Sequence, residues 1–296
     1  MSGAESPVRV LTLLVRYGEA SYGDALSRLD AVFHRQAPEV ERETIVVDNA
    51  LPPGHVAQTE RGLSVIGGDN SAHEFSGWDR AVSHVGRALD GFDVVHLATS
   101  AFGMLYTGYL ERFDSGVLRL VADRPIAAGH IDYYPHAVAV GEQVSQHWLR
   151  TSFVFLAPRE VRGLRTLVSH RSRQALFSGD PRRPFRADGP VSEGCARLIV
   201  DWLTSPRGTG QGVAWHSRID LGTGSLRRFE DKAMAILNEH ALSVRLRAQG
   251  CAAVDLSYLA LATRRGEAPL FWPSWRRQVT DRADASHAFP PAGRFS

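Results

Sequence analysis

The stretch VRVLTLLV, Val8 to Val15, decides the fold class of this chain. A near-continuous apolar run of this kind is typical of a strand that is buried on both faces of a parallel sheet. After a polar turn, Tyr22 to Arg35 is expected to form a helix, because apolar residues recur there at helical spacing: Ala25, Leu29, Val32 and Phe33. A strand followed by a helix is the first half of a β-α-β unit.

The same alternation continues along the first half of the chain. Further strands are predicted at Thr44 to Val47, Leu63 to Ile66, Phe92 to Leu97 and Ser152 to Leu156, and a further helix at Ser76 to Leu89. Trp78 lies on the apolar side of that helix, so we expect it to be buried against the sheet. The pattern predicts an α/β protein with an open, mostly parallel sheet flanked by helices.

The pattern of alternating strands and helices ends in the second half of the sequence. Helices are predicted at Val191 to Leu203 and at Leu226 to Gln249, and Gly250 is placed to end the second one. The segment after Arg264 has no clear period and is expected to pack as an irregular arm. We therefore predict an α/β core over residues 1–177 and a C-terminal helical region with an irregular tail over residues 178–296.

Composition excludes several classes of function. The 296 residues carry a formal net charge of +2, which gives no reason to expect a nucleic-acid partner. Cys195 and Cys251 form no Cys-x-x-Cys pair, so neither a zinc site nor a disulfide framework is indicated. Residues 1–7 lack the apolar run of a signal peptide, and no stretch approaches the roughly 20 apolar residues of a membrane span. We expect a soluble, cytoplasmic protein.

Polar residues follow four of the predicted strands. They are Arg16-Tyr17, Asp48-Asn49, Asp69-Asn70-Ser71 and Thr99-Ser100. In open α/β sheets, ligands bind beyond the carboxyl ends of the strands. Strand-end polar residues are often only turn formers, but a set of four indicates a crevice for a small molecule.

Common motifs of other α/β enzymes are missing. The turn after the first strand, Arg16 to Ala20, does not read Gly-x-Gly-x-x-Gly. The chain has no Gly-x-x-x-x-Gly-Lys-[Ser/Thr] loop, and its single lysine, Lys232, lies in a predicted C-terminal helix. No Gly-x-Ser-x-Gly elbow follows a strand. Dehydrogenase, P-loop and α/β-hydrolase functions are therefore disfavoured.

Five stretches, taken in order, resemble GT-A glycosyltransferases of the family-2 and rhamnan-synthesis types. They are IVVDNA (Ile45 to Ala50), GGDNSAHEFSGWDRAV (Gly67 to Val82), FDVVHLATSAFGML (Phe92 to Leu105), QHWLRTSFVFL (Gln146 to Leu156) and NEHALSVRLRAQG (Asn238 to Gly250). The resemblance covers roughly residues 8–160 and 230–260. It implies a nucleotide-diphospho-sugar donor and a glycan or small-molecule acceptor, in bacterial polysaccharide or natural-product glycosylation.

The resemblance also implies roles for particular residues. Asp48 would hold the nucleoside of the donor, and Asn70 would lie at the wall of the pocket. The remaining residues assigned to the donor are Arg16, Tyr17, Thr99 and Ser100. For the acceptor, Trp148 would stack on a sugar face. Glu239 is assigned to the acceptor by the resemblance alone, and a charge on the helix surface is the alternative interpretation. For Trp148, packing in the core is the alternative interpretation.

One departure from the family concerns metal. Such enzymes place an Asp-x-Asp pair after the fourth strand, where it holds Mg²⁺ or Mn²⁺ against the diphosphate. This chain has Ala98-Thr99-Ser100 there, with no carboxylate. We therefore expect no metal-binding residues, although a divalent ion carried by the nucleotide remains possible. Arg16, or arginines between residues 171 and 186, would then stabilise the diphosphate.

An inverting transfer needs a carboxylate or histidine that deprotonates the acceptor. Asp132 is the first candidate by order along the chain, and Glu142 is the second. A turn or helix-cap role is the alternative for Asp132. A metal cluster of His130, Asp132 and His136 is also conceivable, but chance pairs are common among twelve histidines.

Two other functions remain open. The missing Asp-x-Asp pair is compatible with a GT-A-like domain that binds a nucleotide or glycan without catalysis. A different α/β transferase, such as a methyltransferase, would use Asp48 to hold a ribose, but the absent glycine-rich first turn disfavours it.

Overall fold

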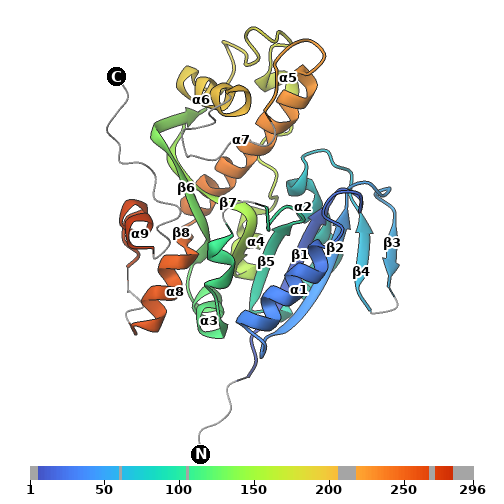
Figure 1. The fold of residues 1–296 in the computed structure, drawn as a ribbon, viewed down its shortest axis with the longest axis vertical. Helices are drawn as coiled ribbons and strands as arrows, with labels where there is room; N and C mark the ends of the chain where they lie inside the picture. Colours follow the sequence, from blue (N-terminus) through green and yellow to red (C-terminus); the bar gives the residue numbers. More distant parts are fainter. Residues whose placement is uncertain (1–5, 60–61, 105–106, 206–217, 267–270, 283–296) are drawn as a thin grey trace, which may run out of the picture.

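The structure is a computed structural model that describes residues 6–59, 62–104, 107–205, 218–266 and 271–282 (Figure 1). Its centre is an eight-stranded sheet in the order β3-β4-β2-β1-β5-β7-β6-β8. The strands are β1 (Arg9–Arg16), β2 (Glu41–Asp48), β3 (Val56–Gln58), β4 (Ser64–Gly67), β5 (Val94–Thr99), β6 (Ile126–Val140), β7 (Gln143–Leu156) and β8 (Ala252–Asp255). Only β3 and β7 run against the others, so the sheet is mixed and mostly parallel, as predicted.

Helices cover both faces of the sheet. The described part of the chain forms α1 (Ala25–Gln36), α2 (Glu74–Val85), α3 (Ser115–Asp123), α4 (Pro158–Leu164), α5 (Arg173–Leu176), α6 (Glu193–Thr204), α7 (Leu226–Ala248), α8 (Leu256–Arg264) and α9 (Trp275–Asp281), with 3-10 turns η1 (Gly86–Gly91) and η2 (Gly108–Glu111). Helices α1, α3 and α8 pack on one face. Helices α2, α4 and the second half of α7 pack on the other. The α/β class is thereby confirmed.

The central strand β1 shows why its sequence is apolar throughout. Val10 and Leu14 point to the face that carries α1, and Leu11, Leu13 and Val15 point to the face that carries α2. Both faces are buried, so alternation with polar residues is lost. The predicted strand is confirmed.

Trp78 holds α2 against the sheet, as predicted. Its side chain is 0% exposed. Its indole Nε1 donates to the backbone oxygens of Leu13 and Ala98, at 3.0 and 3.3 Å. One side chain of α2 thus bonds to both β1 and β5, and fixes the helix over the line where these two strands meet.

A third cluster of buried side chains lies beyond the sheet. Strands β6 and β7 form a long hairpin whose far end leaves the other strands and carries α5, α6 and the first half of α7, at the top of Figure 1. Tyr134 and Trp148 of the hairpin pack there against Leu237. This extension places α6 and α7 above the carboxyl edge of the sheet.

The end of the chain differs from the prediction. Strand β8 pairs in parallel with β6 and completes the sheet, and α9 forms in the segment expected to be an irregular arm. The expectation of an irregular arm is wrong for this segment, because Gln278 and Arg282 anchor α9 through side-chain bonds to Asp255 at the end of β8. A side-chain contact between two segments that have no apolar periodicity leaves no pattern in the sequence. The division at residue 178 stays a prediction, but β8, α8 and α9 do return to the core.

Candidate functional site

The sheet changes its direction of growth between β1 and β5. The chain lays β2 and β4 on one side of β1 and then places β5 on the other side. Such a switch point opens a crevice at the carboxyl ends of the two strands. Arg16 ends β1 and Thr99 ends β5, so the strand-end residues Arg16 and Thr99 border the expected ligand position.

A large bulge in β7 lies beside this edge. Gly129 and Ile131 of β6 pair with Val154 and Leu149 of β7, so His130 alone stands opposite residues 150–153. Bulges release backbone groups from the ladder and re-aim side chains, often next to active sites. The residues at 150–152 are therefore turned out of the regular pairing with β6.

These bulged residues line a cavity of about 170 Å³. Side chains of β5, β7, α2, α6 and α7 line this cavity. Its lining is Glu74, Thr99, Arg150, Thr151, Ser152, Trp202, Ile236 and Glu239. Two carboxylates, one guanidinium, three hydroxyls and an indole suit a small polyhydroxylated ligand better than an apolar one.

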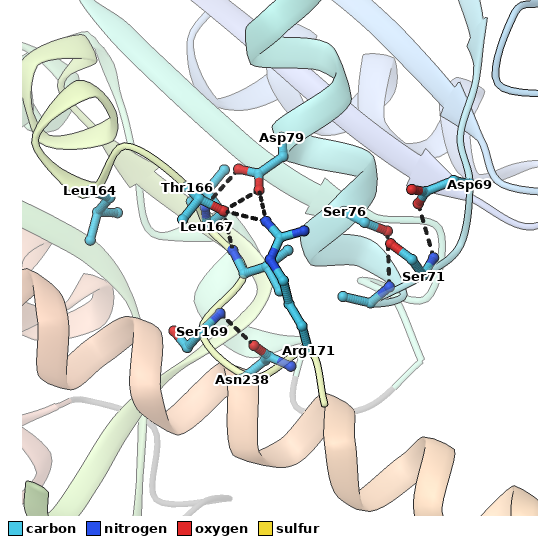
Figure 2. Close-up of polar contacts among 12 residues, drawn as sticks. Asp69, Ser71, Ser76, Asp79, Leu164, Thr166, Leu167, Ser169, Arg171 and Asn238 are labelled. Atoms are coloured by element: carbon cyan, nitrogen blue, oxygen red, sulfur yellow. Dashed lines mark hydrogen bonds and ion pairs between the residues drawn. The ribbon is translucent and has the colours of Figure 1, made fainter. Parts of the chain in front are cut away.

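The segment between α4 and α5, residues 165–172, connects α2 and α7 on either side of this cavity. Asp79 of α2 accepts a hydrogen bond from the backbone N–H of Leu167, at 2.6 Å. Asn238 of α7 accepts one from the backbone N–H of Ser169, at 2.7 Å. Figure 2 shows Asp79 and Asn238 approaching this segment from opposite sides. Each helix carries one cavity carboxylate, and the two helices are held at a fixed separation by the residues between them.

Glu239 is an acid of the cavity wall whose pKa is strongly shifted. Its Oε1 accepts hydrogen bonds from the backbone N–H and the hydroxyl of Thr151, at 2.8 and 3.1 Å. Burial raises the pKa of Glu239 to about 7, against the opposing effects of the Thr151 N–H and the charge of Arg150. Burial also raises the pKa of Glu74. A carboxyl with a pKa near neutrality can both accept and release a proton at working pH.

Asp132 lies behind the cavity wall and forms an ion pair with Arg150. Its Oδ2 is 3.1 Å from Nε of Arg150, and its side chain is buried. Burial opposes ionisation of Asp132, but the charge of Arg150 and a hydrogen bond from His130 outweigh it and lower its pKa to about 2. Asp132 is therefore an ionised partner of Arg150. Glu142, the second predicted base, is exposed in the turn between β6 and β7 and does not line the cavity.

The predicted donor residues at the end of β1 and β2 bind one another. Asp48 accepts from Nε of Arg16 and from the backbone N–H of Gly18, both at 2.8 Å. Arg16 also pairs with Glu19, at 2.8 Å. These contacts hold the loop after β1. Arg16 additionally borders a second cavity, of about 560 Å³, on the α1 side of β2 and β4. Tyr17 is 67% exposed.

Three further predicted residues lie outside the cavity wall. Asn70 is exposed and accepts a hydrogen bond from Asn49 Nδ2, at 3.1 Å. Ser100 donates its backbone N–H to Val15. Trp148 is buried against Tyr134 and the ring of His240, which agrees with the core-packing interpretation. Whether any of these three touches a ligand stays a prediction.

Of the residues on the cavity wall, Thr99 and Glu239 were predicted from the sequence, whereas Glu74, Arg150 and Trp202 were not. Glu74 and Arg150 lie inside two of the quoted stretches, but no spacing distinguished them from other charged residues. The bulge that turns Arg150 outward arises from the register between β6 and β7, which the sequence does not display.

A divalent metal is the cofactor that the resemblance implies. The end of β5 offers only the hydroxyls of Thr99 and Ser100, whereas Mg²⁺ and Mn²⁺ in proteins are normally fixed by at least one carboxylate. Among the residues that the structure describes, no three His, Cys, Asp or Glu side chains are grouped so as to hold an ion. The donor set does not fit a metal held by the protein itself.

Among the helices in the described part of the chain, none has the length and apolar character to cross a membrane. Comparison of the chain with models of protein families, with curated proteins and with solved structures gives no match.

Proposed function

We propose that this protein is a glycosyltransferase with a GT-A-type core, which transfers a sugar from a nucleotide-diphospho-sugar to a hydroxyl of a glycan or small-molecule acceptor. The mostly parallel sheet, with its switch point between β1 and β5, supports this assignment. So does the position of the polar cavity at the carboxyl end of β5, where such a sheet binds its ligands.

Glu239 is the proposed general base. The acceptor hydroxyl gives its proton to the Glu239 carboxylate, and the oxygen forms a bond to the anomeric carbon of the donor sugar. The bond from that carbon to the diphosphate breaks, and its electron pair stays on the departing phosphate oxygen. This direct displacement inverts the anomeric centre. A pKa of about 7 makes Glu239 a stronger base than an ordinary glutamate, while leaving it largely ionised in weakly alkaline solution.

Asp132 is less suited to that role, although the order of the chain favoured it. Its pKa of about 2 makes it a weak base. Its two oxygens face Arg150 and His130, and it does not line the cavity. We assign it the task of holding Arg150.

Arg150 is the proposed cation for the leaving diphosphate. A guanidinium presents several N–H donors in a fixed fork, which matches phosphate oxygens. Fixed positive charge next to a departing anion lowers the barrier to its departure. No step of the proposed transfer passes through a metal ion.

The observation that carries the proposal is the pair of opposite groups on one cavity wall, a carboxylate with a pKa near 7 and a guanidinium beside it. The test is a thermal-shift screen of nucleotide-diphospho-sugars, with and without Mn²⁺, against S-adenosylmethionine. Binding at a hundredfold excess over Kd stabilises the folded state by about 2.7 kcal/mol.

Each outcome of the screen points to one function. A shift with one nucleotide-sugar, followed by release of its nucleoside diphosphate on addition of acceptors, supports the transferase. A shift without turnover supports the non-catalytic binding protein. A shift with S-adenosylmethionine alone would overturn the proposal in favour of a methyltransferase.

A further inference from the structure

Arg282 is a buried arginine at the end of the C-terminal helix α9. Its side chain is 3% exposed, although α9 itself lies at the surface. Its NH1 donates to Oδ2 of Asp255 at 3.0 Å and to the backbone oxygen of Ile131 at 3.1 Å. Asp255 ends β8 and Ile131 lies in β6, so this side chain ties α9 to two adjacent strands.

His130 continues these contacts towards the cavity. Its Nδ1 lies 3.4 Å from NH1 of Arg282, and its Nε2 lies 3.5 Å from Oδ1 of Asp132. A neutral ring with its hydrogen on Nε2 can donate to Asp132, while its Nδ1 shares one of the two NH1 hydrogens of Arg282 that also serve Asp255 and Ile131. The other oxygen of Asp132, Oδ2, lies 3.1 Å from Nε of Arg150.

The result is a line of four side chains, Arg282, His130, Asp132 and Arg150, which runs from α9 to the cavity wall, and the first three of them are buried. Burying charged groups costs free energy unless each is paired, so such a line is weak evidence for stability by itself. It does solve a local problem. Arg150 lies in the bulge of β7, where the backbone has lost its pairing with β6. The pairing with β6 therefore does not fix the direction of Arg150, and the buried carboxylate of Asp132 contacts it instead.

We propose that Arg282 is a positioning residue: it holds Arg150 at the cavity wall through His130 and Asp132, so that α9 sets the affinity of the cavity for an anionic group. The contacts do not depend on the proposed function, but the meaning given to them, a grip on the diphosphate of the donor, rests on it. Helix α9 then acts on the ligand site without lining it, although it lies about 130 residues from Arg150 in the sequence.

The first test measures Arg150 directly and needs no ligand. In a proton–nitrogen NMR spectrum of arginine side chains, the Nε–H signal of Arg150, assigned by its loss in Arg150→Lys, is expected to exchange slowly with solvent. Arg282→Met should speed this exchange about tenfold or more, the factor for loss of one charge-assisted hydrogen bond. Arg277→Met is the matched control. Arg277 is in the same helix but is exposed and pairs with Asp281, at 3.4 Å.

Arg282→Met leaves the buried Asp255 without its cationic partner, so that variant can fail to fold. His130→Phe keeps a ring against Tyr109 and removes both nitrogens, and it should also speed the exchange of the Arg150 Nε–H. Slow exchange that is unchanged in a folded Arg282→Met or His130→Phe protein would overturn the proposal, as would a wild-type Arg150 signal without protection.

A second test links the contacts to the ligand. Inorganic pyrophosphate is titrated into the wild type, Arg282→Met and Arg277→Met by calorimetry. We expect about tenfold weaker binding in the first variant and no change in the second. Faster exchange of Arg150 with unchanged pyrophosphate affinity would retain the contacts and reject their role in the proposed function. Unchanged exchange would reject the positioning role itself, whatever the activity of the protein proves to be.

Discussion

Glu239 of α7 accepts hydrogen bonds from both the backbone N–H and the hydroxyl of Thr151, at 2.8 and 3.1 Å, inside the bulge of β7. A backbone N–H that the ladder has released thus orients the carboxyl that we propose as the base. The same bulge presents Arg150 to the cavity. One irregularity in strand pairing therefore brings the proposed base and the proposed cation to one wall.

Replacing Glu239 with Gln should remove the base and leave the fold intact, because the amide oxygen can still accept from Thr151. Loss of a general base typically lowers the rate about 10²–10⁴-fold. In the wild type, kcat/KM should rise as the pH passes upward through about 7, because Glu239 must be ionised to take a proton. The variant should lack this dependence. Glu142→Gln, at the exposed hairpin turn, serves as the control. If Asp132→Asn loses the pH dependence of kcat/KM while Glu239→Gln keeps it, Asp132 and not Glu239 is the base.

Replacing Arg150 with Lys should weaken binding of pyrophosphate, because a point charge does not reproduce the bidentate fork. The expected loss is about ten- to a hundredfold, as for one or two bonds to a charged group. Arg16→Lys is the matched variant, since Arg16 is also paired with carboxylates, Asp48 and Glu19, but does not line this cavity. Calorimetry with pyrophosphate on both variants shows which arginine binds the diphosphate. A large effect from Arg16→Lys alone would return the diphosphate to the end of β1, as the sequence first indicated.

Turnover should persist in EDTA, or respond to Mg²⁺ and Mn²⁺ only as far as the ions bind the phosphates of the nucleotide. The reason is the donor set at the end of β5, where Thr99 and Ser100 offer neutral oxygens. Calorimetry with Mn²⁺ in the absence of nucleotide should detect only weak binding. Tight binding of Mn²⁺ to the free protein, lost in Glu74→Gln or Glu239→Gln, would contradict this expectation.

Trp78→Ala should destabilise the protein by about 3–5 kcal/mol, the usual cost of removing a large buried aromatic side chain. Trp78→Phe should cost less, about 1–3 kcal/mol, because it keeps most of the packing but leaves the backbone oxygens of Leu13 and Ala98 without the indole donor. Denaturant unfolding measures both values. Equal costs for the two variants would show that the hydrogen bonds of the indole, and not its bulk, hold α2 in place.

His96 should make the protein less stable in acid. The ring is fully buried, stacks on Phe155 and has its Nδ1 3.3 Å from the hydroxyl of Thr12. Burial lowers its pKa well below 6.5. As the pH falls below 6.5, the unfolded chain takes up a proton at this position and the folded chain does not, so the free energy of unfolding decreases.

The variant His96→Phe should remove this component of the pH dependence, whatever constant cost it carries from the unpaired Thr12 hydroxyl. His34→Gln, exposed on α1, should leave the slope unchanged. Unfolding in urea at several pH values provides the comparison. A slope that is identical in the wild type and His96→Phe would show that other groups cause the acid sensitivity.

Much of the α/β core is determined by the sequence alone. The continuous apolar run of β1 and the short run of β2 read correctly as strands, because residues buried on both faces of a sheet cannot alternate with polar ones. Helices α1, α2, α6 and α7 follow from apolar periodicity, and Gly250 ends α7 in the left-handed conformation, with φ of 88°. These features depend on neighbours within a few residues of one another.

The site is decided by tertiary structure. Thr99 could be placed at a strand end from the sequence, but the meeting of Glu74, Arg150 and Glu239 depends on a register shift between β6 and β7 and on the segment that spaces α2 from α7. The ionisation of Asp132 and Glu239 is likewise a property of their surroundings. Both are ordinary acids in the sequence, yet the pKa of one is lowered to about 2 by a guanidinium and that of the other is raised to about 7 by burial. Local patterns record which residues are apolar, whereas the pKa of a carboxyl depends on which charges and how much water the folded chain brings within a few ångströms of it.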